Sequence, residues 1–162
     1  DDEVICGNTR PKIEGVVGTS LNWKGLSLSL NFRYQLGADV FNEALFNKVE
    51  NISTEGLNKN QDKRALYERW QKAGDIVRFK NIANAASTPM SSRFVQEENV
   101  LTLESVYLGY EFYDGWIQKL GLSNLKLQVS MRDVFRASSI KSERGISYPF
   151  ARSLEAGLSF NF

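Results

Sequence analysis

Five segments of this chain alternate apolar and polar side chains with a period of two, and this pattern constrains the fold more than any other feature. The segments span about residues 13–23, 25–35, 101–112, 125–136 and 150–162. Because successive side chains of a β-strand point to opposite faces, the pattern predicts strands with one apolar and one polar face. A soluble β-sandwich and a membrane-spanning β-barrel both contain such strands, and the alternation alone does not separate the two.

Three features of these segments favour the barrel. The apolar faces are about five residues long, which matches membrane strands of about 9–11 residues. Aromatic side chains lie near the ends of the faces and are similar to the aromatic girdles of outer-membrane barrels. They are Trp23, Phe32, Tyr34, Tyr110, Phe112, Phe135, Phe160 and Phe162. The opposite faces carry charged residues, which a water-filled lumen tolerates. These candidate lumen-facing residues are Arg33, Glu111, Lys126, Arg132 and Glu155.

The connections between the segments alternate in length. Lys24-Gly25 joins the first two strands tightly, and residues 113–124 join the third to the fourth by a moderately short connection. Longer connections run over about residues 37–100 and 137–149. Short periplasmic turns that alternate with long external loops are typical of outer-membrane barrels. The order therefore predicts a C-terminus on the periplasmic side.

Length and composition exclude several classes of protein. The chain has 162 residues, which leaves room for a small eight-stranded barrel, but five strands cannot close around a filled interior because about eight are needed. No apolar run reaches the roughly 18 residues of a membrane helix. A net charge of +1 gives no nucleic-acid surface, and the absence of histidine with a single cysteine removes the usual acid/base and zinc ligands. We therefore expect no enzyme, no metal and no cofactor.

The long connection is not of low complexity. Apolar residues fit helical spacing in two places, at Val40, Phe41, Ala44, Leu45 and Val49 and again at Leu66, Tyr67 and Trp70. We expect two short helices in a structured external loop, and a structured loop of this length is usually functional.

Three residues of this loop are candidate contacts to a ligand or to a covering partner, namely Tyr67, Trp70 and Asp75. A loop tryptophan is more often the core of its loop, and Asp75 after Gly74 is typical of a turn.

Several motifs, in this order, resemble the C-terminal end of SusC/RagA-type TonB-dependent outer-membrane transporters of Bacteroidota. They are residues 7–12 (GNTRPK), Arg69-Trp70 with Gly74-Asp75, Arg93-Phe94-Val95 before residues 101–110 (LTLESVYLGY), and Ser147-Tyr148-Pro149 before residues 152–158 (RSLEAGL). The chain departs from the family at residues 133–135 (DVF), where the family has NLF, and at residues 78–80 (RFK), which lack a common proline.

The resemblance implies an all-β chain that supplies the last five antiparallel strands of a barrel of about 22 strands. Its implied partners are the remaining strands and the plug of the same transporter, a SusD-like surface lipoprotein, the TonB complex and the lipid bilayer. It implies import of an oligosaccharide or a peptide across the bacterial outer membrane, with the plug absent from this chain. The alternative is a soluble β-sandwich module that binds carbohydrate or protein.

The end of the chain resembles an outer-membrane assembly signal. Phe160 and Phe162 follow apolar residues at alternate positions. A terminal β-strand with unpaired backbone groups can be extended by the strand of another protein, here the barrel assembly machinery. The alternative is an ordinary amphipathic edge strand.

Overall fold

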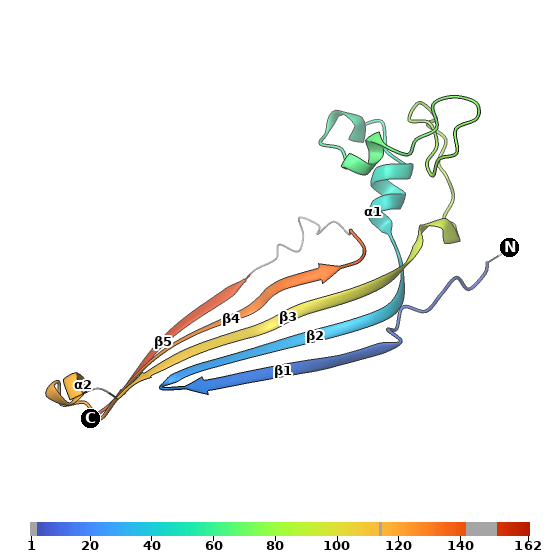
Figure 1. Cartoon of the computed structure of the whole chain (residues 1–162). Coiled ribbons are helices and arrows are strands. Elements are labelled where there is room, and N and C mark those ends of the chain that lie inside the picture. Colours follow the sequence, from blue (N-terminus) through green and yellow to red (C-terminus); the bar gives the residue numbers. More distant parts are fainter. Residues whose placement is uncertain (1–2, 114, 142–151) are drawn as a thin grey trace. The chain divides into compact units, whose positions relative to one another are not determined.

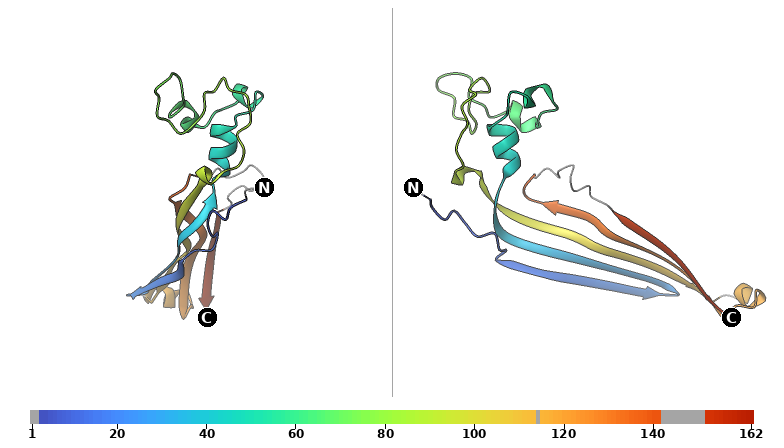
Figure 2. Two further views of the ribbon diagram at one scale, coloured as in Figure 1. Left: turned by 90° about the vertical axis from the view of Figure 1, so that its right-hand side faces the viewer. Right: turned by 180° about the vertical axis from the view of Figure 1, so that it is seen from behind.

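A computed structural model describes residues 3–113, 115–141 and 152–162 of the chain. Its strands are β1 (Ile13–Trp23), β2 (Leu26–Phe41), β3 (Val95–Phe112), β4 (Asn124–Ser138) and β5 (Ser153–Asn161). They form one sheet in chain order, with β1 and β5 as its edges (Figure 1), and the view from behind in Figure 2 shows the same order. The expected sheet of five antiparallel strands is confirmed.

The segment between β2 and β3 differs in detail from the expectation. β2 continues to Phe41 and β3 already begins at Val95, so Val40 and Phe41 lie in a strand and not in a helix. The first helix is α1 (Glu43–Leu45), which Asn42 caps by accepting a hydrogen bond from the Leu45 amide, and a π-helical turn over Phe46–Glu50 follows it directly.

The prediction of a second helix around Leu66, Tyr67 and Trp70 is wrong, apart from a single turn. A 3₁₀ turn spans Lys63–Leu66, and the chain becomes extended at Tyr67. Glu68 has a positive φ of 57°, which a right-handed helix does not contain. Tyr67 and Trp70 therefore lie outside any helix, although their spacing fits one. Further 3₁₀ turns span Gly56–Asn58 and Ser92–Phe94.

The described residues divide into two compact units. Among the described residues, the loop unit comprises 3–10, Ala38–Glu97 and 140–141, and the sheet unit comprises Pro11–Gly37, 98–113, 115–139 and 152–162. The sheet unit also contains the helix α2 (Gly115–Lys119) between β3 and β4. None of the helices in the described ranges has the length and apolar character needed to cross a membrane.

In the sheet unit, the register of β1 and β2 separates an apolar face from a polar face. In every second pair the β2 residue is apolar or aromatic, for example Val17 with Phe32 and Leu21 with Leu28, while the β2 residues of the pairs between them are polar, for example Ser20 with Ser29. Lys24 and Gly25 both have positive φ, at 45° and 87°, as a two-residue type I′ turn requires. The turn therefore fixes the register that sorts the two faces.

A β-bulge lies where the alternation of apolar and polar residues in β3 changes phase, and it keeps the apolar and polar faces of the sheet separate. Between the pairs Leu103–Phe135 and Ser105–Arg132, β3 advances two residues and β4 advances three. Glu104 and Ser105 are neighbours, yet both bond to polar-face side chains of β2: Glu104 pairs with Arg33, and Asn31 donates to Ser105 over 2.9 Å.

The consequence is that Leu101 and Leu103 rejoin the apolar face. Their partners, Ala137 and Phe135, continue the odd-numbered apolar series of β4 that begins with Leu125. The alternation of β3 is therefore interrupted at Glu104, beside the register shift in which β4 contributes one residue more than β3.

The core of the loop unit is small and aromatic. Leu45, Val49, Ala65, Phe79 and Phe94 are buried together, and Phe41, Phe46 and Ile52 pack against them. The rings of Phe46 and Phe94 meet edge to face, with their centroids 5.2 Å apart.

Asp133 tests the bulge, because it lies opposite Glu104 with a positive φ of 51°. Replacing Asp133 by Val should destabilise the sheet by about 1–2 kcal/mol, since a β-branched residue is strained in the left-handed region. Asp133→Gly should be at least as stable as the native protein. The midpoint of heat denaturation of the purified protein measures both variants, and equal midpoints for Val and Gly would contradict the bulge.

Candidate functional site

The candidate site of the loop unit is the stretch that contains Tyr67, Trp70 and Asp75. A short parallel bridge joins Arg69 to Phe79, where the Trp70 amide donates to the Phe79 carbonyl over 3.0 Å. The Phe79 amide in turn donates to the Glu68 carbonyl over 3.1 Å. These bonds close the segment between Glu68 and Phe79 into a compact turn.

Asp75 shapes this turn. Its carboxylate accepts hydrogen bonds from the backbone amides of Gln71 and Lys72, at 3.0 and 2.9 Å. Gly74 before it has a positive φ of 96°, which glycine adopts without strain. Asp75 therefore holds the loop in shape, and its carboxylate is already engaged by backbone donors.

The two aromatic candidates are exposed. Tyr67 is 57% exposed and Trp70 is 43% exposed, and neither belongs to the buried cluster of the loop unit. The expectation that a loop tryptophan forms the core of its loop does not hold for Trp70. The indole and the phenol present apolar surface to the solvent, which is the arrangement that an aromatic contact residue needs.

Arg69, directly before Trp70, is buried and fixes this stretch. Its guanidinium donates to the Ala65 carbonyl over 2.6 Å, to the Lys80 carbonyl over 2.9 Å, and to the Val49 carbonyl. Burial lowers the pKa of Arg69, and the negative charge of Glu50 opposes that effect. An arginine remains charged in a protein, so three carbonyl oxygens are held around one cation.

Glu50 is the second buried charge, and its side chain is only 2% exposed. It accepts hydrogen bonds from the Thr88 hydroxyl at 2.8 Å, from the Arg93 guanidinium at 2.7 Å and from the Lys80 amide at 3.3 Å. Burial raises the pKa of Glu50, but these hydrogen bonds and the charge of Arg93 together outweigh burial and lower it.

Sequence reasoning misses Glu50 and the structural roles of Arg69 and Arg93. In the sequence, Arg69-Trp70 and Arg93-Phe94-Val95 stand out only as motifs. In the structure, Arg69 is buried and donates to three carbonyl oxygens, whereas Arg93 is half exposed and donates to the buried Glu50 carboxylate. The signal in the sequence is an arginine next to an aromatic residue.

The five candidate lumen-facing residues lie along the sheet unit and do not converge on one point. Glu111 lies opposite Lys126 in the register of β3 and β4. Arg132 lies opposite Ser105 on one side and Ser153 on the other, and the Ser130 hydroxyl is 3.4 Å from the Glu155 carboxylate. Arg33 pairs with Glu104. Together they form a polar wall that carries charges of both signs.

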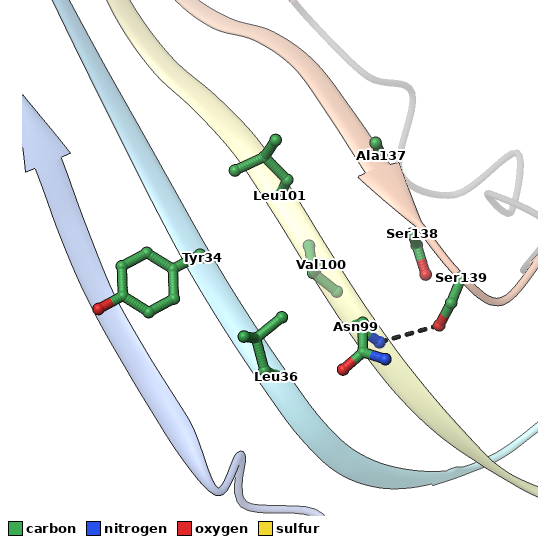
Figure 3. Close-up of a pocket in the computed structure, with 8 residues that line it drawn as sticks. All are labelled: Tyr34, Leu36, Asn99, Val100, Leu101, Ala137, Ser138 and Ser139. Atoms are coloured by element: carbon green, nitrogen blue, oxygen red, sulfur yellow. Dashed lines mark hydrogen bonds between the residues drawn. The ribbon is translucent and has the colours of Figure 1, made fainter.

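The apolar face of the sheet unit carries a hollow of about 360 Å³ (Figure 3). Its lining comes from β2, β3, β4 and the residue after β4, and consists of Tyr34, Leu36, Asn99, Val100, Leu101, Ala137, Ser138 and Ser139. The Asn99 amide donates to the Ser139 hydroxyl over 2.9 Å. The lining contains no ionisable acid or base other than the Tyr34 phenol, so it suits apolar contact and not acid/base chemistry.

The C-terminal aromatic residues lie at the edge strand β5. Phe160 pairs with Leu125 of β4, and its ring lies 5.6 Å from that of Phe162 between centroids. Both side chains are exposed. The motif Ser147-Tyr148-Pro149 lies outside the described residues, as does the beginning of the expected strand 150–162. In the described ranges, no three metal-ligating side chains come together.

Known proteins resemble this chain in sequence and in fold. No family model matches the sequence. The TonB-dependent receptor P39 of Formosa agariphila is 24% identical over 139 residues, which cover 83% of this chain and 13% of that receptor. The structure of the RagAB peptide importer in its open-open state matches with a TM-score of 0.72 and 18% identity, over 98% of this chain and 18% of that one. The sequence is thus similar to part of a TonB-dependent receptor, and the fold matches part of the RagAB importer.

A second solved structure also matches the fold of this chain. The RagAB peptide importer in its closed-closed state matches with a TM-score of 0.66 and 19% identity, over 85% of this chain and 15% of that one. The chain spans less than a fifth of the length of each of these relatives. These relatives are a TonB-dependent receptor and a peptide importer.

The Glu50 network gives a prediction about pH. A carboxylate whose pKa is lowered by folding stabilises the folded loop above its unfolded pKa, and this stabilisation is lost as the pH falls through the folded pKa. Glu50→Gln should cost about 1–3 kcal/mol at neutral pH, because Arg93 loses a buried charged partner. It should also flatten the acid limb of loop stability below about pH 4.5.

Hydrogen exchange of the amides between Asn42 and Phe94 measures this stability as a function of pH. Glu55→Gln, at an exposed position of the same unit, is the matched control. Equal protection in the Glu50→Gln and Glu55→Gln variants would show that Glu50 does not hold the loop.

Proposed function

We propose that this chain forms the C-terminal part of the barrel wall of a TonB-dependent transporter, which imports glycans or peptides across the outer membrane. The observation that carries the proposal is the exposed apolar face of the sheet. Large apolar side chains are exposed on every one of the five strands, among them Leu21, Leu36, Leu108, Leu127 and Leu158. A soluble protein rarely leaves so much contiguous apolar surface open, whereas acyl chains of a bilayer would cover it.

The polar face fits the same proposal. A lumen filled with water and protein accepts charges of both signs, and Arg33, Glu104, Glu111 and Lys126 supply them. The edges β1 and β5 would pair with further strands, because a sheet in hydrocarbon cannot leave backbone groups unpaired. The similarity to longer receptors supports the existence of such strands.

The connections support an orientation. The Lys24-Gly25 turn and the α2 connection belong to one end of the strands, and β5 ends beside the beginning of β4 at that same end. Short connections are periplasmic in outer-membrane barrels, so the C-terminus would be periplasmic and the loop unit extracellular. Tyr67 and Trp70 would then be available to substrate or to a SusD-like lipoprotein that covers the transporter, as the similarity to the RagAB importer suggests.

Cell fractionation tests the proposal. The native protein that carries this chain should sediment with outer membranes and require detergent for extraction. A labelled peptide and a labelled oligosaccharide, each followed into cells with and without the gene, would show which class is imported. Recovery of the protein in the aqueous fraction would instead favour the soluble β-sandwich module.

The exposed aromatic side chains give a prediction about uptake. Removing both rings by Tyr67→Ala and Trp70→Ala should raise the KM of uptake about tenfold, which corresponds to about 1.4 kcal/mol of lost contact energy. The amount of transporter in the membrane should stay the same, because neither ring is part of the core. Trp116→Ala, in α2, is the control, and an unchanged KM in the double variant would remove these residues from the site.

The C-terminal residue gives a prediction about assembly. Deleting Phe162 should lower the amount of transporter in the outer membrane several-fold, because the assembly machinery would lose an aromatic anchor on the terminal strand. Phe162→Tyr keeps the ring and should restore the level. Quantitative blotting of outer membranes measures all three proteins, and an unchanged level after deletion would leave β5 as an ordinary edge strand.

A further inference from the structure

The loop unit contains a cavity of about 330 Å³ that is separate from the exposed Tyr67 and Trp70. Its apolar lining consists of Leu45, Phe79, Phe94 and Val95, and its polar lining consists of Arg78, Arg93 and Gln96. A cavity of this size is at the lower end of the range for small-molecule sites, which combine apolar walls with a few placed polar groups.

Arg93 is the fixed cation of this cavity. Its guanidinium donates to the Glu50 carboxylate over 2.7 Å and to the Arg78 carbonyl over 3.1 Å, and lies 4.8 Å from the centre of the Phe94 ring. Because Glu50 is buried and is itself held by Thr88 and the Lys80 amide, it neutralises Arg93 and holds it in place. Arg93 therefore shapes the wall without adding a net charge.

Arg78 is the available cation. Its side chain is 74% exposed, and its ion pair with Glu68 is long, at 3.8 Å, with an acceptor that is itself exposed. Such a pair contributes little to stability, so a better-placed carboxylate can replace Glu68. The cavity thus has one positive charge to offer, which suits one carboxylate better than a polyanion.

Gln96 and the apolar lining indicate which chemical groups besides a carboxylate would fit the cavity. The side-chain amide of Asn42 donates to the side-chain oxygen Oε1 of Gln96 over 2.8 Å, which fixes the orientation of the Gln96 carboxamide. Phe79 and Phe94 are buried in the core of the loop unit, so only small parts of their rings line the cavity and a sugar ring has little face to stack on. The lining instead accepts a compact apolar group.

We propose that this cavity binds a compact ligand that bears one carboxylate beside an apolar group, such as the C-terminal residue of a peptide. The carboxylate would form a two-pronged contact with Arg78, the geometry that guanidinium groups favour. The apolar group would lie against Leu45, Phe79 and Phe94. This inference rests on the proposed function, because it makes the cavity a substrate subsite of the transporter.

Two matched peptides test the proposal on the purified full-length transporter. The tripeptide Ala-Ala-Leu should bind at least tenfold more tightly with a free carboxylate than with a C-terminal amide, as isothermal calorimetry measures. Arg78→Gln should reduce the affinity for the free acid to that for the amide, and Arg78→Lys should restore part of it. Lys72→Gln, which removes an exposed cation outside the cavity, should leave both affinities unchanged.

The carboxylate of the ligand could come from a peptide or from a sugar acid, and a sugar acid as a second probe distinguishes the two. Galacturonate, which bears one carboxylate, and its neutral methyl ester form the second matched pair, and discrimination in that pair alone would assign the same subsite to sugar acids. Equal affinity of acid and neutral form in both pairs, or an Arg78→Gln variant that still discriminates, would overturn the inference. Uptake of a neutral oligosaccharide would then continue to support the transporter, whereas recovery of the protein in the aqueous fraction would remove the proposed function itself.

Discussion

A β-strand has only two faces, and all five strands of this sheet use one for apolar and one for polar side chains. Everything else in the sheet unit follows from keeping those faces separate. The type I′ turn at Lys24-Gly25 sets the register of β1 and β2 so that apolar residues meet apolar partners. A slip of one residue would move the whole apolar set to the other face, so the turn and the faces depend on each other.

The bulge at Glu104 shows how strictly this separation is maintained. The sequence of β3 changes phase between Leu103 and Val106, and regular alternation would have placed Leu101 and Leu103 among the charges of the polar face. The register shift, in which β4 carries the extra residue, accompanies this change of phase, and Glu104 beside it gives Arg33 a carboxylate partner. A local irregularity therefore preserves both the apolar face and the charge balance of the polar face.

The sequence predicts the strands, because their alternation of apolar and polar residues is a local pattern. It does not predict features that form only through contacts between distant residues. The alternation in residues such as Leu26, Leu28 and Leu30 predicts the strands and their order, because that pattern is local. The change of phase between Leu103 and Val106 marks an irregularity, but only the pairing with β4 shows that the extra residue of the bulge lies in β4. Val40 and Phe41 fit a helix and a strand equally well in isolation, and pairing within the sheet decides for the strand.

The same distinction explains the candidate sites. Trp70 is a candidate because of its residue type, but its exposure follows from Arg69, whose side chain turns inward to three carbonyl oxygens from separate segments. Consecutive residues thus have opposite environments, and no property of either residue alone shows which one is buried. Glu50 lies far in sequence from Thr88 and Arg93, so the network that forms the wall of the Arg78 cavity is visible only once the chain has folded. Because that network already neutralises Arg93, the charge that distinguishes the cavity belongs to Arg78, the residue with the weaker and more exposed partner.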